Sequence, residues 1–200
     1  MSVRAGSDRT RDRVLTVPNV VSLARLALIA AFLYLLLVSK ADGPAVAVLM
    51  LGGASDWVDG KLARLLNQSS NLGALLDPAI DRLYMVAIPI SFGIRGLVPW
   101  AIIGVLLARD LLLAATLPIL RHRGLNALPV TYIGKAGTFA LMSAFPLILL
   151  GQCTASWGPV VLSIGWAFLI WGVGLYLWAA VLYFMQVILV VHTMPRIAGG

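Results

Sequence analysis

The chain has 200 residues, of which 60% are hydrophobic and only 12% are charged. Soluble domains carry about 25% charged residues, so this composition excludes an ordinary soluble protein and indicates a polytopic membrane protein with one domain, residues 1–200. The net charge of +7 suits anionic lipid headgroups and phosphate-bearing substrates, and with this hydropathy we expect no nucleic-acid partner.

Six apolar segments follow a polar, basic arm that covers residues 1–16. Pro18 marks the start of the first helix, because proline is favoured in a first helical turn. The apolar segments cover residues 21–39, 45–66, 73–94, 100–120, 132–151 and 159–191. The last segment is too long for one straight crossing, so it tilts or emerges from the bilayer. We therefore predict an all-α integral membrane protein with six transmembrane helices.

Basic residues gather in alternate connections between these segments. One set comprises Arg4, Arg9, Arg11, Arg13, Lys61, Arg64, Arg121, Arg123 and Arg196. The opposite connections carry only Lys40 and Arg95. Because cytoplasmic connections are enriched in lysine and arginine, we predict that both termini are cytoplasmic in a multi-pass plasma-membrane protein.

All eight acidic residues are aspartates, and four of them lie in one short stretch. On helices, Asp56 and Asp59 are i,i+3 neighbours, and Asp77 and Asp81 are i,i+4 neighbours, so each pair lies on one helix face. Two such faces packed together would gather four carboxylates, which repel one another without cations. Hard divalent ions prefer carboxylate oxygen, so we predict two bound Mg²⁺ or Mn²⁺ ions.

The spacing of this stretch is D-x2-D-G-x2-A-R-x8-G-x3-D-x3-D, which resembles the signature of the CDP-alcohol phosphotransferase family. The matching residues are Asp56, Asp59, Gly60, Ala63, Arg64, Gly73, Asp77 and Asp81. The resemblance implies a six-helix membrane enzyme whose site faces the cytosol. It also implies transfer of a phosphatidyl group from CDP-diacylglycerol to an alcohol, with release of CMP.

The roles of the aspartates follow from the needs of phosphoryl chemistry and agree with what the resemblance implies. Asp56, Asp59 and Asp77 are the expected principal metal ligands, because metals clamped on the pyrophosphate stabilise the leaving CMP. Asp81 is the expected general base that accepts the proton of the attacking hydroxyl. The sequence leaves open whether Asp81 also binds metal.

Further residues are candidates for binding CDP-diacylglycerol. Gly60, Gly73 and Ala63 are small enough for close approach of the nucleotide, and Arg64 can pair with phosphate or with the acidic cluster. Near the start of the first helix, Asn19 and Ser22 resemble the family's first-helix segment and are candidates as well. Helix capping is the alternative role for Asn19 and Ser22.

Two basic residues are candidates for binding the acceptor alcohol. Arg109 is followed by Asp110 inside an apolar segment, where an ion pair indicates function or internal structure. Lys135 lies near the start of the fifth helix, where it binds acceptor phosphate or extends to the membrane surface. Family members that use glycerol 3-phosphate read G-K-x-K-T there. This chain has Gly137 at the second lysine position, which we expect to disfavour a doubly charged phosphate.

These features favour phosphatidylglycerol as the acceptor, giving cardiolipin and CMP. Glycerol 3-phosphate, giving phosphatidylglycerol phosphate, is the close alternative, and inositol phosphate is the third. The expected partners are CDP-diacylglycerol, the acceptor, membrane lipids and a second copy of the chain in a homodimer. A cation transporter is the alternative of another class, since aspartates inside membranes also mark ion pathways. A purely structural membrane protein is a further alternative, which the motif makes improbable.

Overall fold

The computed structural model describes the backbone of residues 17–66, 71–121, 123 and 132–193, and their side chains except at 17–22, 56–66, 71–79, 81, 119 and 121. The expected basic arm, residues 1–16, lies outside this description. Within it the chain is all helical, as predicted, with α1 at Val17–Leu33, α2 at Asp42–Leu66, α3 at Asn71–Ile94, α4 at Trp100–Arg121, α5 at Tyr132–Cys153 and α6 at Gly158–Thr193.

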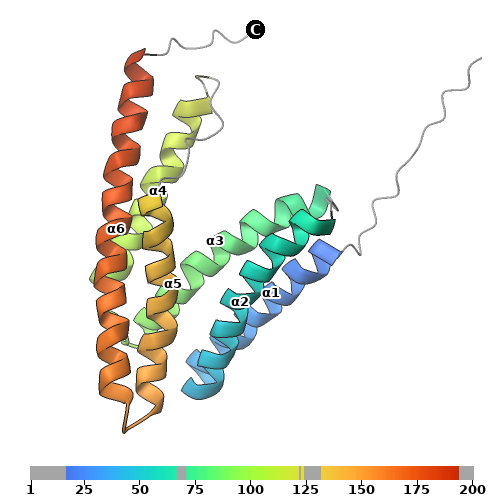
Figure 1. The fold of residues 1–200 in the computed structure, drawn as a ribbon, viewed down its shortest axis with the longest axis vertical. Coiled ribbons are helices and arrows are strands. Elements are labelled where there is room, and N and C mark those ends of the chain that lie inside the picture. Colours follow the sequence, from blue (N-terminus) through green and yellow to red (C-terminus); the bar gives the residue numbers. More distant parts are fainter. Residues whose placement is uncertain (1–16, 67–70, 122, 124–131, 194–200) are drawn as a thin grey trace, which may run out of the picture.

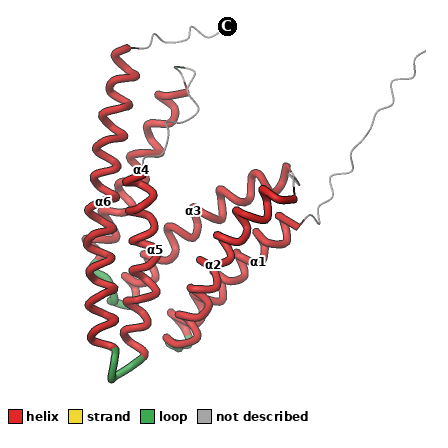
Figure 2. The backbone as a smooth tube through the Cα atoms, in the orientation of Figure 1, coloured by secondary structure: helices red, strands yellow, loops and turns green. Residues whose placement is uncertain are grey.

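The six helices run alternately down and up along the molecule (Figure 1). One end, the upper end in this view, therefore holds the start of α1, the α2–α3 junction, the ends of α4 and α6, and the start of α5. The short α3–α4 and α5–α6 turns lie at the opposite, lower end (Figure 2). Both halves of the aspartate motif thus belong to the end that also holds the start of α1 and the end of α6.

The helix boundaries follow the hydropathy pattern closely, with differences at two starts. The second helix begins at Asp42 instead of residue 45, because Pro44 fits within its first turn, where no intrahelical N–H partner is needed. The third begins at Asn71 instead of 73. A five-residue π-helix at Tyr34–Val38 continues α1 before the turn, in which Lys40 has a φ of 51°.

Three helical segments are long and apolar enough to cross a membrane within the described residues: Trp100–Pro118, Tyr132–Cys153 and Gly158–Thr193. Shorter apolar segments occupy Leu23–Val38 and Arg82–Ile94. The protein is therefore a membrane protein, and the predicted count of six spans stays a prediction. The sixth helix is one continuous element of 36 residues, about 54 Å long at 1.5 Å per residue, so it exceeds a hydrocarbon core of about 30 Å.

An aromatic cluster in the core connects α1, α3 and α5. Phe92 stacks on Phe32 at 6.4 Å between ring centroids and meets the edge of Phe145 at 5.0 Å. All three rings are buried, and Phe92 is fully so. Such aromatic pairs contribute about 0.5–1.5 kcal/mol each beyond the area that they bury.

Helices α5 and α6 approach each other at backbone distance because glycines line their contact. A Cβ atom added to Gly165 would lie 2.8 Å from the backbone nitrogen of Ile148, and one added to Gly151 would lie 2.9 Å from that of Leu162. Small residues allow this close packing of membrane helices, where the hydrophobic effect does not drive association. The glycines therefore hold α5 and α6 as one rigid pair.

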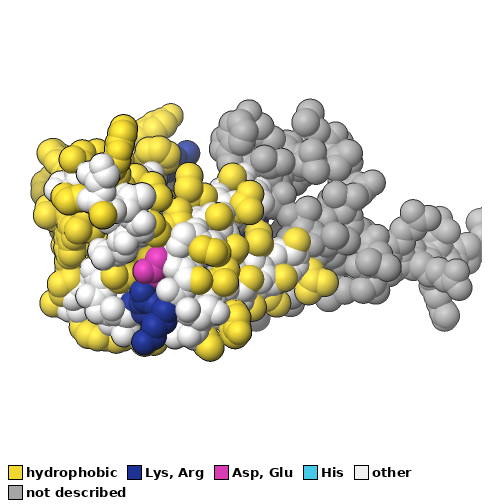
Figure 3. All heavy atoms as spheres, turned by 90° about the horizontal axis from the view of Figure 1, so that it is seen from below, with side chains coloured by type: hydrophobic (Ala, Val, Ile, Leu, Met, Phe, Trp, Pro, Cys, Tyr) yellow, Lys and Arg dark blue, Asp and Glu magenta, His cyan; other side chains and the backbone are white. Residues whose placement is uncertain are grey.

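The lower end of the molecule carries a compact group of basic and acidic side chains on an otherwise largely apolar face (Figure 3). Arg95, after α3, donates through Nη1 to the carbonyl of Leu36 at 2.8 Å and through Nη2 to Asp42 Oδ1 at 2.8 Å. Arg95 therefore joins the end of α3 to the α1–α2 turn, and its charge is paired locally.

Candidate functional site

The aspartate motif lies on α2 and α3, on either side of the junction at residues 67–70. Asp56 and Asp59 occupy the last three turns of α2, and Asp77 and Asp81 lie in the first half of α3. The candidate residues whose side chains fall outside the described set are Asn19, Ser22, Asp56, Asp59, Gly60, Ala63, Arg64, Gly73, Asp77 and Asp81.

A contact next to the motif fixes how α2 and α3 face each other. The Tyr84 ring lies against Gly52, where an added Cβ would be 3.5 Å from the ring and from Oη. The same hydroxyl donates to the carbonyl of Leu49 at 3.4 Å. Tyr84 therefore marks the face of α3 that meets α2, and Gly52 marks the face of α2 that meets α3.

The motif positions share these two faces. At 3.6 residues per turn, positions 52, 56 and 59 fall within an arc of about 60° on α2, and positions 77, 81 and 84 fall within a similar arc on α3. Because the helices are antiparallel, moving from Gly52 to Asp56 and from Tyr84 to Asp81 leads toward the same end of the molecule. The backbone register thus places all four positions at about one level, on facing sides of two helices.

The donor chemistry of these positions fits divalent cations. The four motif positions supply carboxylate oxygen alone, which is the ligand that Mg²⁺ and Mn²⁺ prefer. Among the described side chains, no group of three or more histidine, cysteine, aspartate or glutamate residues could hold a metal ion. The described aspartates, Asp42 and Asp110, each form an ion pair with an arginine instead.

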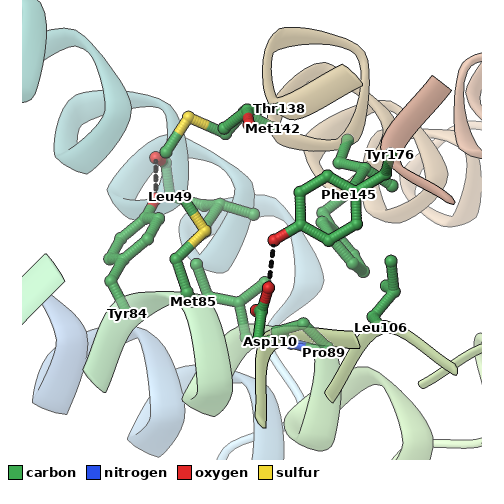
Figure 4. Close-up of a pocket in the computed structure, with 12 residues that line it drawn as sticks. Leu49, Tyr84, Met85, Pro89, Leu106, Asp110, Thr138, Met142, Phe145 and Tyr176 are labelled. Carbon is green, nitrogen blue, oxygen red and sulfur yellow. Dashed lines mark hydrogen bonds between the residues drawn. The ribbon is translucent and has the colours of Figure 1, made fainter. Parts of the chain in front are cut away.

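A cavity of about 50 Å³ lies between the helices, and its lining residues are shown in Figure 4. Tyr84 stands at the wall nearest the motif, and Asp110 contributes the only charged side chain of the described lining. The remaining lining residues are Leu49, Met85, Ile88, Pro89, Leu106, Thr138, Leu141, Met142, Phe145 and Tyr176. Helices α2 to α6 therefore all contribute to one largely apolar chamber.

The predicted Arg109–Asp110 ion pair in the fourth helix is present, and Tyr176 of α6 also bonds to Asp110. Arg109 Nη1 lies 3.0 Å from Asp110 Oδ1, and the Tyr176 hydroxyl of α6 donates to that same oxygen at 2.5 Å. The Arg109 guanidinium also lies over the Tyr176 ring, 3.8 Å from its centroid. Asp110 faces the cavity, whereas Arg109 is not among the residues that line it. Arg109 therefore acts on the cavity through Asp110.

Lys135 and Gly137 lie on different sides of α5. The Lys135 side chain is exposed, with Nζ 5.5 Å from the Tyr132 ring centroid. It lies three residues from Thr138, a cavity-lining residue on the same helix face. Gly137 instead packs on α6, where an added Cβ would lie 3.0 Å from the backbone nitrogen of Tyr176. Residue 137 therefore packs against α6, and its expected effect on the choice of acceptor stays a prediction.

The sequence analysis missed Tyr84 and Tyr176, which line the cavity from α3 and α6. Tyr84 follows Asp81 by three residues, so its helical spacing from the motif was a usable signal. Tyr176 carried no such signal, because it lies about 66 residues from its partner in an evenly apolar helix. Arg25, 7% exposed on α1, is a further buried charge within the helix that packs against both α2 and α3.

Comparison with known proteins identifies the family of the chain. The family model for CDP-alcohol phosphatidyltransferases matches residues 15–178 of the chain, which include α2, α3, the motif and every residue that lines the cavity. The chain belongs to the CDP-alcohol phosphatidyltransferase family. It is accordingly an enzyme of a class that uses a CDP-alcohol donor, an alcohol acceptor and, in general, divalent metal ions.

The chain is similar to several named members of this CDP-alcohol phosphatidyltransferase family. A Mycobacterium tuberculosis protein, named provisionally as a cardiolipin synthase, is 62% identical over 95% of this chain and 91% of its own length. The CMP-forming cardiolipin synthase of Streptomyces coelicolor is 48% identical over 88% and 84%. A CDP-diacylglycerol–glycerol-3-phosphate 3-phosphatidyltransferase of Cereibacter sphaeroides is 32% identical over 68% and 64%. None of the three is named as a transporter, so the cation-transporter alternative has no support.

Proposed function

We propose that this phosphatidyltransferase moves the phosphatidyl group of CDP-diacylglycerol to phosphatidylglycerol, giving cardiolipin and CMP. The reaction class is carried by the register of α2 and α3, which sets four aspartate positions on facing sides at one level. The acceptor is supported by the names of the relatives at 62% and 48% identity. The relative named for glycerol 3-phosphate is only 32% identical, which makes that acceptor the second candidate.

The four aspartates have two roles in this proposal, metal binding and proton acceptance. Asp56, Asp59 and Asp77 would hold two divalent cations, Mg²⁺ or Mn²⁺, which neutralise the pyrophosphate of the donor when bound. Asp81, at the end of the set nearest the cavity, accepts the proton of the acceptor's hydroxyl as that oxygen attacks the phosphatidyl phosphorus. The bond from this phosphorus to the CMP oxygen breaks, and CMP leaves.

The remaining candidates hold the two substrates. Small residues of the motif, Gly60, Ala63 and Gly73, leave room for the nucleotide, and Arg64 pairs with phosphate. The positions of Asn19 and Ser22 on the first two turns of α1 suit a role at the same end. At the acceptor side, Lys135 binds phosphate directly, since it is exposed and lies three residues from the lining residue Thr138. Arg109 acts by fixing Asp110.

We further propose that the site faces the cytoplasm of a plasma-membrane protein with six spans. The sequence supports this orientation, because the connections at the lower end carry only Lys40 and Arg95 as basic residues. The motif end carries the larger share of the arginines in the sequence. Cytoplasmic connections are the ones enriched in lysine and arginine.

A reaction with the purified protein tests the proposed function. CDP-diacylglycerol is supplied with phosphatidylglycerol and glycerol 3-phosphate together, with Mg²⁺ or Mn²⁺, and the lipid products and CMP are measured. We expect cardiolipin and CMP in equal amounts, and no turnover after chelation by EDTA. Phosphatidylglycerol phosphate without cardiolipin would move the assignment to the second acceptor, and full activity in EDTA would contradict the metal proposal.

A further inference from the structure

The polar groups of the cavity lack free donors. Each of its three hydroxyls already donates a hydrogen bond: Tyr84 to the carbonyl of Leu49, Thr138 to that of Gly134 and Tyr176 to Asp110. Among the lining residues that the structure describes there is no lysine, arginine or histidine. A ligand that enters this chamber meets apolar walls and hydrogen-bond acceptors, so a neutral group that donates a hydrogen bond suits it better than a phosphate does.

Asp110 is the strongest acceptor of this lining, and half of its carboxylate is unused. Arg109 and Tyr176 both bond to Oδ1, whereas Oδ2 accepts no hydrogen bond from any side chain that the structure describes. The side chain is 35% exposed, against 16% for its partner Arg109. A charged oxygen at an apolar wall is costly unless a donor reaches it.

The cavity connects this oxygen with the proposed reaction centre. Tyr84 lies one helical turn from Asp81 at one end of the chamber, and Asp110 lies on its wall between α3 and α6 (Figure 4). Both candidate acceptors contain a glycerol unit whose primary hydroxyl reacts and whose secondary hydroxyl is on the adjacent carbon. Contact between such a glycerol and Asp110 requires that its primary hydroxyl is at Asp81 and that its secondary hydroxyl extends into this chamber.

We propose, on the basis of the function proposed above, that Asp110 binds the secondary hydroxyl of the acceptor's glycerol and that Tyr176 is the positioning residue of this contact. Tyr176 fixes Asp110 with its hydroxyl and supports Arg109 with its ring. The carboxylate is thereby oriented from two sides before the acceptor arrives. Sites built to bond a hydroxyl strongly reject an analogue that lacks it.

An acceptor without the secondary hydroxyl tests this contact. Phosphatidyl-1,3-propanediol keeps the primary hydroxyl of phosphatidylglycerol and lacks only the secondary one. We expect wild-type kcat/KM to be about tenfold to hundredfold higher for phosphatidylglycerol, the range of one charge-assisted hydrogen bond. In Asp110→Asn this preference should fall about tenfold, while the KM for CDP-diacylglycerol stays unchanged. Tyr176→Phe, which keeps the ring over Arg109, should lose part of the preference.

The matched control is Asp42→Asn, which removes the carboxylate of the other described arginine–aspartate pair, whose members do not line the cavity. It should keep the wild-type preference. Equal wild-type efficiency with both lipids would overturn the inference, as would an Asp110→Asn or Tyr176→Phe enzyme that loses activity with both lipids in the same proportion. If Asp110→Asn does not fold, Tyr176→Phe decides between these outcomes.

The experiments give different results if the proposed function is wrong and if only this inference is wrong. A wild-type enzyme that releases no CMP with any acceptor contradicts the function. If glycerol 3-phosphate proves to be the acceptor, the same comparison is made between it and 3-hydroxypropyl phosphate. A preference that depends on Asp110 would then support the contact for that acceptor, and no such preference would overturn it.

Discussion

The proposed roles of individual residues follow from where each one lies relative to Tyr84 and the cavity. Asp77 and Asp81 are one turn apart on α3, and Asp81 is the nearer of the two to Tyr84 and the cavity. In the function proposed above the cavity is the acceptor side, so we assign the proton to Asp81, the nearer of the two aspartates. The same logic separates Lys135 from Gly137 on α5, since one is exposed and the other meets the α6 backbone.

Asp81→Asn tests the assignment of the base. The amide keeps the size of the side chain but does not accept the proton, so kcat should fall about 10²–10⁴-fold while the KM for CDP-diacylglycerol changes little. Steady-state kinetics at saturating Mg²⁺ measure this, with Asp42→Asn as the control that should remain near wild type. A parallel loss of substrate binding would assign Asp81 to metal ligation instead.

Asp77→Asn should show the complementary behaviour. Removing one carboxylate from the proposed ligand set weakens cation binding, so the Mg²⁺ concentration for half-maximal rate should rise, on the order of tenfold or more. Titration of activity with Mg²⁺, supported by calorimetry of Mn²⁺ binding to the purified protein, measures the shift. An unchanged metal dependence together with reduced kcat would remove Asp77 from the ligand set.

The helices pack against one another in two different ways. Helices α5 and α6 form a pair at glycine contacts, whereas α1, α3 and α5 meet through the rings of Phe32, Phe92 and Phe145. The glycine pair carries Thr138 and Tyr176, so its spacing sets the width of the cavity. A change that separates α5 from α6 would therefore move Tyr176 relative to Asp110.

Gly165→Ala tests the glycine contact at the element scale. Its new Cβ would lie 2.8 Å from the Ile148 nitrogen, which forces the helices apart and should destabilise the protein by about 1–3 kcal/mol. Gly174→Ala is the matched control on the same helix, because nothing lies within 4 Å of its added Cβ. That variant should be neutral or stabilised by up to about 1 kcal/mol.

Thermal unfolding in detergent compares the two variants. A lower midpoint for Gly165→Ala alone supports rigid α5–α6 packing, and equal midpoints contradict it. By the same reasoning Gly137→Lys should destabilise the protein without changing the acceptor, since its side chain would begin at the α6 backbone.

At the scale of the whole molecule, the alternating helices separate two chemically distinct ends. The motif, the start of α1 and the end of α6 belong to one end, and the Arg95–Asp42 pair and the α5–α6 turn belong to the other (Figures 1 and 3). If the motif end faces the cytoplasm, every residue of the opposite end faces the outside. A label on a residue at either end therefore reports on which side of the membrane the site lies.

Cys153 supplies a native probe of this orientation. It is the single cysteine of the chain, it is exposed, and it ends α5 beside the turn at the lower end. A membrane-impermeant maleimide added to intact cells or spheroplasts should therefore label it. In a Cys153→Ser background, Ser2→Cys should be labelled only after the cells are opened. The reverse pattern would place the site outside the cytoplasm.

The sequence by itself determined the all-helical class, the helix boundaries to within a few residues, the family and the aspartate set. These depend on local properties: hydropathy sets the apolar segments, and the fixed spacing of the motif follows from helical periodicity. Only the tertiary structure decided which side of α5 carries Gly137, and that Tyr176 meets Asp110. Those facts depend on how helices distant in sequence rotate and pack against one another, and an evenly apolar helix such as α6 has no periodicity that reveals its inward face.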